Sequence, residues 1–171
     1  MRRSPIFFGV LAVTVVTYWE HFQYVVALII LLIAVRTVLR ITRFVRRLVA
    51  NRKLRHVDVM NGIEFEEHIA NVLKSQGYTN IQLTEQFDYG VDIVASKNGI
   101  RWGIQVKRYS GLVKADAVRQ VVTGLKVYGC DRAMVITNSV FSRVAVRLAE
   151  SNDCVLVDRV QLSRMGIALW R

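Results

Sequence analysis

Two long uncharged segments near the N-terminus constrain this chain more than any other feature. The first runs for sixteen residues from Ser4 to Trp19, and the second for fourteen residues from Phe22 to Val35. As helices, which rise about 1.5 Å per residue, the first spans roughly 24 Å and the second about 27 Å if it continues to Leu39. A bilayer's hydrocarbon core is about 30 Å thick. Segments of this length and composition therefore predict a membrane anchor over residues 1–39.

Charged and aromatic residues around the two segments predict that the anchor crosses the membrane twice. Arginines flank both outer ends, whereas the intervening pair Glu20-His21 has no Lys or Arg beside it. Positive residues tend to stay in the cytoplasm and aromatic residues to gather at membrane interfaces. Four aromatic residues surround the pair: Tyr18, Trp19, Phe22 and Tyr24. We therefore expect a transmembrane α-helical hairpin, multi-pass in the inner (cytoplasmic) membrane, with both ends in the cytoplasm.

Two alternatives explain the same segments. A single helix over residues 22–39 crosses the membrane while the first segment lies in the interface, because each segment is short. A signal peptide would explain Arg2, Arg3 and the first apolar segment. However, this segment is followed by a second apolar segment and not by a small-x-small cleavage site. With either membrane topology, the positive cluster after the second segment keeps the rest of the chain cytoplasmic.

The positive charge is concentrated in the N-terminal third of the chain. Residues 1–55 hold ten of the 24 Lys and Arg residues and one of the 13 Asp and Glu residues, out of a net charge of +11. Within a linker over residues 40–58, apolar residues recur at helical spacing between arginines, which predicts a basic amphipathic helix over 40–55. This helix suits anionic lipid headgroups or DNA phosphates. Its place directly after a membrane segment favours the lipid.

Residues 59–171 have the pattern of an α/β domain. We expect a mixed central sheet flanked by helices. The predicted helices are 61–76, 115–128, 141–150 and 160–165, and the predicted strands are 81–83, 91–95, 100–108, 133–137 and 154–157. The two cysteines, Cys130 and Cys154, have no CxxC spacing and the three histidines are scattered, which argues against a disulfide framework or a zinc site.

Four polar residues are expected to converge on one face of this sheet. Gln105 and Lys107 share a face of strand 100–108 because side chains alternate along a strand. Asp92 lies in the otherwise apolar strand 91–95, which a Lys-Asn-Gly turn pairs with strand 100–108. A charged side chain is rarely buried in such a strand without a partner. Glu66 lies at the edge of the buried stripe of helix 61–76. Carboxylate and amide oxygens are ligands that Mg²⁺ prefers, and a neighbouring lysine can steady an attacking water.

A purely structural interpretation accounts for the same residues. Asp92 and Lys107 can form a cross-strand ion pair, with Gln105 at the surface and Glu66 solvated. The spacing D-x12-Q-x-K is loose, so the pattern alone leaves both interpretations open.

Four longer blocks resemble a known family. They are FEEHIANVLKSQGY (65–78), DYGVDIVA (88–95), IQVKRYS (104–110) and AVRQVVTGLKVYGCDRAMVITNSVFS (117–142). In this order they resemble the Mrr-type restriction endonuclease domain of the PD-(D/E)xK nuclease superfamily, over roughly residues 60–160. The resemblance implies a restriction-endonuclease-like core and cleavage of DNA that depends on Mg²⁺ or Mn²⁺.

The resemblance also assigns roles to the four residues. Glu66 matches the acid of the first helix, Asp92 the acid of the DxGxD-like strand, and Lys107 the signature lysine. Gln105 matches the middle metal ligand, where the superfamily more often has an acid. Glu66, Asp92 and Gln105 would then be the metal ligands. Asp88, four residues before Asp92, is either a loop cap or a further positioning group.

Two polar clusters are candidate DNA contacts. The first, Arg108-Tyr109-Ser110, follows Lys107 and either binds phosphates or forms a strand rim. The second, Asn138 and Ser139 with Ser142, follows a buried strand and begins a helix. Such residues are first of all N-caps, and a helix N-terminus also suits a phosphate.

These observations predict a membrane-anchored, metal-dependent endonuclease that acts on DNA, in restriction of foreign or modified DNA or in DNA processing. One alternative is a catalytically inactive, membrane-tethered DNA-binding module of the same fold, and another is a nuclease directed at junctions or RNA. No aromatic platform for stacking single-stranded bases is evident, which favours duplex or branched DNA. Because a double-strand cut needs two active sites, a homodimer is also expected.

Overall fold

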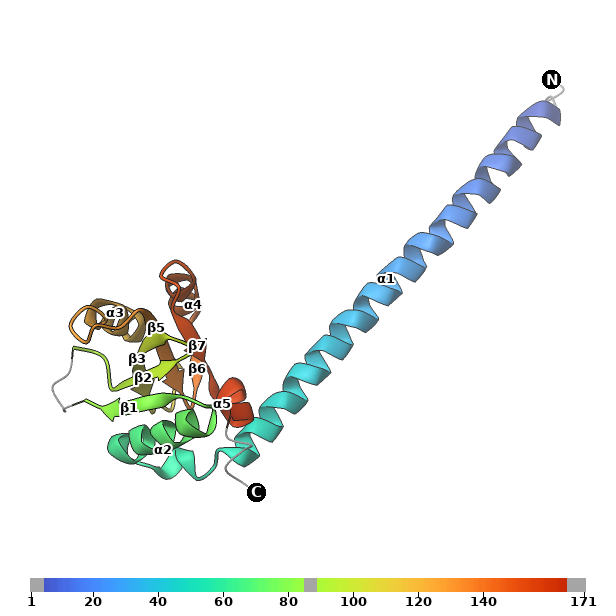
Figure 1. Cartoon of the computed structure of the whole chain (residues 1–171). Coiled ribbons are helices and arrows are strands. Elements are labelled where there is room, and N and C mark those ends of the chain that lie inside the picture. The colour runs from blue at the N-terminus through green and yellow to red at the C-terminus, as the bar shows by residue number, and fades with distance from the viewer. Residues whose placement is uncertain (1–4, 85–88, 166–171) are drawn as a thin grey trace. The chain divides into compact units, whose positions relative to one another are not determined.

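The computed structural model describes residues 5–84 and 89–165 of the chain (Figure 1). The chain divides into two compact units, residues 1–45 and 46–171. A single helix, α1 (Pro5–Lys53), accounts for the described part of the first unit and continues into the second.

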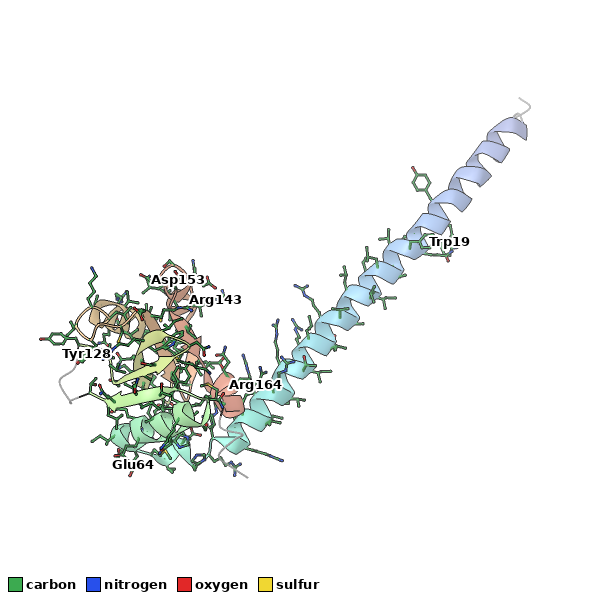
Figure 2. All side chains as sticks on the ribbon, in the orientation of Figure 1. Trp19, Glu64, Tyr128, Arg143, Asp153 and Arg164 are labelled. Atoms are coloured by element: carbon green, nitrogen blue, oxygen red, sulfur yellow. The ribbon has the colours of Figure 1, made fainter. Side chains whose placement is uncertain are left out.

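The α1 helix is continuous, so the predicted hairpin with a turn at Glu20-His21 is wrong. Pro5 occupies the first helical position, where its missing N–H costs nothing. From Val10 to Lys53 the sequence has neither Gly nor Pro, so nothing in it breaks the helix. Among the described residues, one helical segment is long and apolar enough to cross a membrane, Phe22–Arg52, with a mean hydropathy of 2.4. Figure 2 shows side chains standing out along α1, including that of Trp19.

The second unit is built on a five-stranded mixed sheet with the strand order β1-β2-β3-β5-β7. The strand β2 is antiparallel to both of its neighbours, β1 and β3, and β3, β5 and β7 run parallel. Their bounds are β1 Thr79–Leu83, β2 Ile93–Lys97, β3 Ile100–Lys107, β5 Arg132–Thr137 and β7 Val155–Val157. Two short strands, β4 (Leu112–Val113) and β6 (Val140–Phe141), form a separate parallel pair that the sequence did not predict.

Helices cover both faces of the sheet. The helices after α1 are η1 Val57–Val59, α2 Gly62–Ser75, α3 Asp116–Gly124, α4 Arg143–Glu150 and α5 Arg159–Met165. One core joins α2 and α5 to the face that carries Trp102, Ile104 and Val106. The other joins α3 and α4 to the face that carries Val94 and Val135. The predicted mixed α/β fold with a helix-flanked central sheet is confirmed.

Local sequence explains most element ends. Asn61 and Glu64 form a capping box at the start of α2, in which each side chain accepts a hydrogen bond from the other residue's backbone N–H. The predicted helix 115–128 ends early, at Gly124. In the predicted linker, Ala50 and Leu54 are buried within the second unit.

Candidate active site

The pairing of β2 with β3 places Asp92 beside Gln105. The backbone N–H of Asp92 donates to the carbonyl of Ile104 at 2.9 Å, which continues the antiparallel ladder by one residue. The Gln105 Nε2 donates to Asp92 Oδ2 at 2.7 Å, and the N–H of Val106 donates to the same oxygen. Asp92 is thereby fixed against the strand that also carries Lys107.

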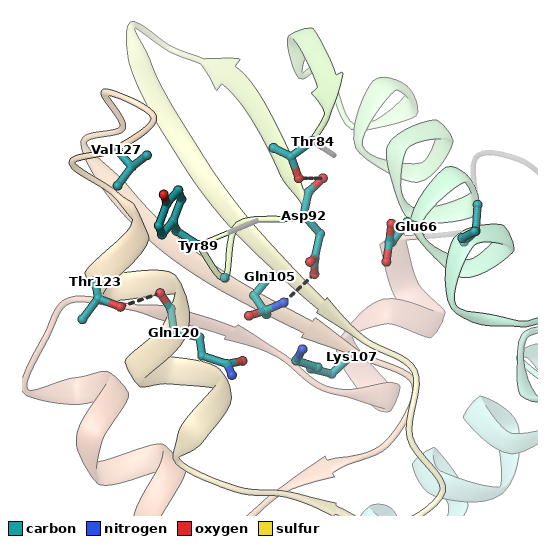
Figure 3. A pocket seen from close by; sticks show the side chains of 11 residues that line it. Glu66, Thr84, Tyr89, Asp92, Gln105, Lys107, Gln120, Thr123 and Val127 are labelled. Atoms are coloured by element: carbon teal, nitrogen blue, oxygen red, sulfur yellow. Dashed lines mark hydrogen bonds between the residues drawn. The ribbon is translucent and has the colours of Figure 1, made fainter. Parts of the chain in front are cut away.

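A cavity of about 480 Å³ opens on these residues (Figure 3). Glu66 enters it from α2, and Asp92, Gln105 and Lys107 enter it from the β2–β3 pair. The four residues that the sequence singled out thus line one cavity. Its wall also contains Thr84, Tyr89, Gln120, Thr123 and Val127.

The most informative atom of the cavity is the amide oxygen of Gln105. Gln105 is only 1% exposed, and its Oε1 has no hydrogen-bond partner, although its Nε2 is bonded to Asp92. A buried polar atom without a partner costs about 1–3 kcal/mol. A ligand or ion that binds in the cavity is one way to supply the missing interaction.

The groups in the cavity that could coordinate a metal include oxygens of the kind that hard divalent cations bind. Glu66 and Asp92 supply carboxylates and Gln105 supplies an unpartnered carbonyl. Among the described residues, no group of three or more His, Cys, Asp or Glu residues is placed to hold a metal. Two acids plus an amide oxygen, completed by water, fit Mg²⁺, which usually keeps several waters and few protein ligands.

Two wall residues that sequence reasoning missed hold the Asp92 loop in place. The Thr84 hydroxyl donates to the carbonyl of Val91 at 2.6 Å, and the Thr84 N–H donates to the carbonyl of Asp92 at 3.0 Å. Gly90 has φ +82°, and a Cβ there would lie 2.5 Å from Gln120 Cβ. The glycine in DYGVD was the available signal for this close approach to α3.

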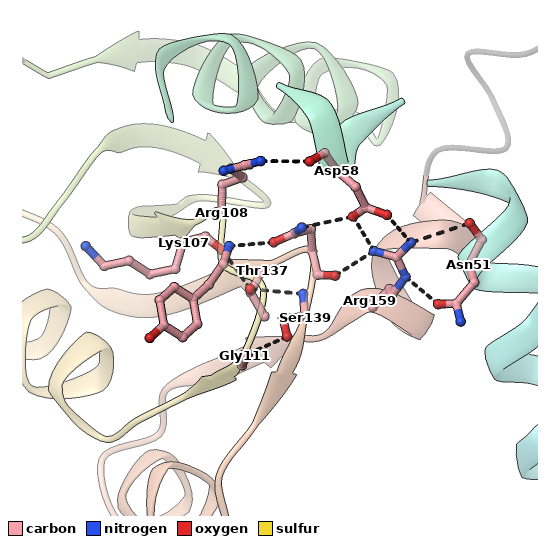
Figure 4. A network of polar contacts seen from close by, with 10 residues as sticks. Asn51, Asp58, Lys107, Arg108, Gly111, Thr137, Ser139 and Arg159 are labelled. Carbon is pink, nitrogen blue, oxygen red and sulfur yellow. Dashed lines mark hydrogen bonds and ion pairs between the residues drawn. The ribbon is translucent and has the colours of Figure 1, made fainter. Parts of the chain in front are cut away.

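The expected DNA contacts lie mostly in a second polar cluster, which we call the Asp58 network (Figure 4). Asn138 is buried; its Oδ1 accepts from the N–H of Tyr109 at 2.7 Å and its Nδ2 donates to Asp58 Oδ1 at 3.0 Å. Arg108 donates through Nη2 to the carbonyl of Asp58 at 2.7 Å. Ser139 Oγ donates to the carbonyl of Gly111. These side chains brace loops around the end of β3.

At the centre of the Asp58 network is an ion pair with Arg159. Its Nη1 and Nη2 donate to the two carboxylate oxygens of Asp58 at 2.6 and 2.7 Å. Arg159 also donates to the Asn51 side chain at 2.7 Å and to the carbonyl of Asn138 at 2.8 Å. Hydrogen bonding from Arg159 holds the pKa of Asp58 below its usual value, against the opposing effect of partial burial.

The remaining candidates divide as follows. Ser142 is the N-cap of α4 and accepts from the N–H of Ala145 at 3.1 Å. Ser110 is exposed and lines a cavity of about 500 Å³ beside the Asp58 network. Asp88 lies outside the described residues.

Residues 57–166 match the Mrr catalytic-domain family, described as restriction endonuclease. The match covers more than half of the chain, so the protein belongs to this family. No curated protein matches.

Two solved structures are similar to this chain. The DNA modification-dependent restriction endonuclease AspBHI aligns with a TM-score of 0.54 and 14% identity, over 71% of this chain and 34% of its own. The protein of unknown function AF1548 aligns with a TM-score of 0.47 and 18% identity, over 54% of this chain and 55% of its own. This chain thus spans about a third to a half of the length of these structures. The likeness to AspBHI supports the restriction-endonuclease-like fold.

Proposed function

We propose that this protein is a metal-dependent endonuclease that hydrolyses phosphodiester bonds of DNA. The observation that carries the proposal is the unpartnered Oε1 of buried Gln105, beside Asp92, in a cavity that also contains Glu66 and Lys107. Membership of a restriction endonuclease family supports DNA as the substrate. Restriction of foreign or modified DNA, or DNA processing, is the proposed role.

Asp92, Gln105 and Glu66 would hold the Mg²⁺ or Mn²⁺ ion. When bound, such an ion lowers the pKa of a coordinated water and neutralises charge that develops on the phosphate. The Gln105 amide and the Val106 N–H orient the Asp92 carboxylate by donating to its Oδ2.

Lys107 supplies the second chemical function of the cavity. Its ammonium extends from the end of β3 beside Gln105 and has no hydrogen-bond or ion-pair partner among the described residues (Figure 3). An ammonium there can hold the attacking water by hydrogen bonding and stabilise negative charge on the phosphate oxygens. Thr84, which follows β1, holds the backbone of Val91 and Asp92, and Gly90 lets the same loop lie close to α3, so the position of Asp92 relative to Lys107 is fixed.

The decisive experiment compares Asp92→Asn with wild type, using the full-length chain in detergent. Wild type should cut or nick DNA with Mg²⁺ or Mn²⁺ and be inactive in EDTA. Asp92→Asn keeps the size of the side chain but removes the charged ligand, so cleavage should fall by about a thousandfold or more. DNA binding should persist.

Asp153→Asn is the matched control, because Asp153 is exposed and lies outside the cavity. This variant should cleave like wild type. Full activity of Asp92→Asn would overturn the metal mechanism. DNA binding without cleavage of any tested form, modified DNA included, would favour a catalytically inactive DNA-binding module.

We further propose that α1 anchors the protein in the inner membrane with a single crossing and that the second unit faces the cytoplasm. The apolar part of Phe22–Arg52 supports a span, and the arginines of 40–55 would bind anionic headgroups. A reporter fused to the N-terminus should be external, and one fused to the C-terminus cytoplasmic. A cytoplasmic N-terminus in a membrane-extracted protein would contradict the single crossing.

Two such chains side by side would provide the two active sites of a double-strand cut.

A further inference from the structure

A second, smaller cavity adjoins the active-site cavity. Its volume is about 300 Å³, near the lower end of the range of ligand sites. Lys107 and Gln120 line both cavities, so the two adjoin at these side chains. A strand whose phosphate lies beside Lys107 would therefore have its next nucleotide at the mouth of the smaller cavity.

The smaller cavity has an aromatic wall that is held in place. Tyr109 lines it and is 54% exposed. Its backbone N–H donates to Asn138 Oδ1 at 2.7 Å, and a Cβ on Gly111 would lie 3.1 Å from Tyr109 Cε1. The ring thus lies against the bare backbone of Gly111 while much of it stays open to solvent. A fixed, exposed ring is a low-entropy stacking surface.

The rest of the lining is apolar at the floor and charged at the edge. Leu112, which is 55% exposed, contributes together with buried Val113 and Ala117. The charged groups are Lys107, Lys114 and Asp116, and Asp116 is already paired with Arg119. The two lysines thus leave the rim positive, which suits a phosphate backbone. Gln120 presents an amide with both a donor and an acceptor.

We propose that the smaller cavity binds one unpaired nucleobase of the strand that is cut. The base stacks on Tyr109, contacts Leu112 and offers its polar edge to Gln120. The proposal rests on the proposed function in one respect: that function places the scissile phosphate beside Lys107. The proposal revises the expectation that the chain has no aromatic stacking platform. The sequence did not indicate Tyr109 as such a platform, because its role depends on where the fold places its ring. The preferred substrate is therefore DNA with a flipped, bulged or otherwise unstacked base.

The test measures binding of DNA to the full-length chain in EDTA, so that no cleavage occurs. The probes are a fully paired duplex and the same duplex with a single bulged 2-aminopurine. Wild type should bind the bulged duplex about tenfold more tightly, as expected for one stacked base. Its 2-aminopurine fluorescence should be quenched on binding, because the base stacks on a ring.

Two pairs of variants isolate the cavity. Tyr109→Ala should reduce the tenfold preference to less than about threefold and abolish the quenching, whereas Tyr109→Phe should retain both. Leu112→Ala should weaken the preference, and Val144→Ala, at a similarly exposed valine of α4, should not. Equal binding of both duplexes by wild type, or a Tyr109→Ala variant that behaves like wild type, would overturn the proposal.

A parallel assay with Mg²⁺ separates this inference from the proposed function. Cleavage of both duplexes at equal rates, with equal affinities, would overturn the base site and leave the nuclease intact. Tyr109-dependent preference for the bulged duplex without cleavage of either would support the base site and count against the nuclease.

Discussion

Two polar clusters meet at the C-terminal end of β3, and they differ in how far their hydrogen-bonding groups are satisfied. In the active-site cavity, Gln105 Oε1 is buried without a partner, and Lys107 has none among the described residues. In the Asp58 network, both oxygens of the carboxylate and all three guanidinium nitrogens of Arg159 are engaged. Only one residue, Arg108, separates Lys107 from Tyr109, whose backbone joins the network.

This contrast separates groups that stabilise the fold from groups kept for a ligand. A satisfied buried network strengthens the folded state, because breaking one partner leaves the others without compensation. An unsatisfied group lowers stability until a ligand binds. Substitutions in the cavity should therefore change activity more than stability, and substitutions in the Asp58 network should do the reverse.

The largest effect is expected for Lys107→Ala. Removing the ammonium takes away the group that steadies the attacking water and the phosphate charge, so cleavage should fall by about a thousandfold. Metal binding should be largely unchanged, because Lys107 is not a ligand. Single-turnover cleavage and metal titration measure the two effects, with Lys126→Ala, an exposed lysine after α3, as control. An active Lys107→Ala enzyme would remove Lys107 from the chemistry.

Arg159→Ala should have the largest effect on stability. It removes the ion pair of Asp58 and a donor to the carbonyl of Asn138, and we expect a loss of about 1–2 kcal/mol in the free energy of unfolding because Asp58 is partly exposed. Denaturant unfolding of the chain measures this, and the exposed Arg143→Ala serves as control. Cleavage of duplex DNA per folded molecule should stay within about threefold of wild type. A stable but inactive Arg159→Ala variant would show that the contrast between the clusters is false.

Gln105 variants should have intermediate effects on activity. Gln105→Ala removes a proposed metal ligand and one donor to Asp92, so cleavage should drop by about ten- to a hundredfold. Gln105→Glu restores an oxygen ligand and should preserve activity or shift the preference between Mg²⁺ and Mn²⁺. Cleavage over a range of both metal concentrations measures this. A Gln105→Ala variant with wild-type cleavage activity would mean that the unpartnered oxygen of Gln105 does not bind the metal.

The smallest expected effect is on the stability of the folded protein at low pH. Because Arg159 lowers the pKa of Asp58 in the folded state, the ion pair contributes its full stability above the unfolded pKa, near 3.8. This contribution is lost as the pH falls through the lower, folded pKa. Wild type should lose more stability than Asp58→Asn as the pH falls below about 4, as measured by thermal unfolding. Parallel loss in both proteins would contradict the depressed pKa.

The sequence predicted the fold where its patterns were local. Alternation along Trp102, Ile104 and Val106 correctly assigned one face of β3 and left Gln105 and Lys107 on the other. The capping residue Asn61 and the Gly77 that follows α2 correctly bounded that helix within a residue or two. Glu66, at the edge of a buried stripe, indeed faces the cavity.

The sequence failed where distant contacts or a missing signal decided the outcome. The aromatic belt around Glu20-His21 suggested a turn, yet no Gly or Pro breaks the helix there. Nothing in the sequence indicated the partners of Asn138 and Ser139, which are Asp58 and Gly111, 80 and 28 residues away; their predicted contact with DNA stays a prediction. Tyr109 could not be recognised as a wall, because its backbone is held by the side chain of Asn138, 29 residues further along the chain.

The close approach of α3 to the Asp92 loop also has a genetic consequence. A Cβ on Gly124 would lie 2.4 Å from the carbonyl oxygen of Tyr89, three residues before Asp92. Alanine normally improves a helix relative to glycine by about 1 kcal/mol, so Gly124→Ala would look harmless by helix propensity. A selection for loss-of-function alleles should nevertheless recover it, as a folded protein with an altered active site and no change in charge. Such alleles would map a part of the active site that contributes no functional group.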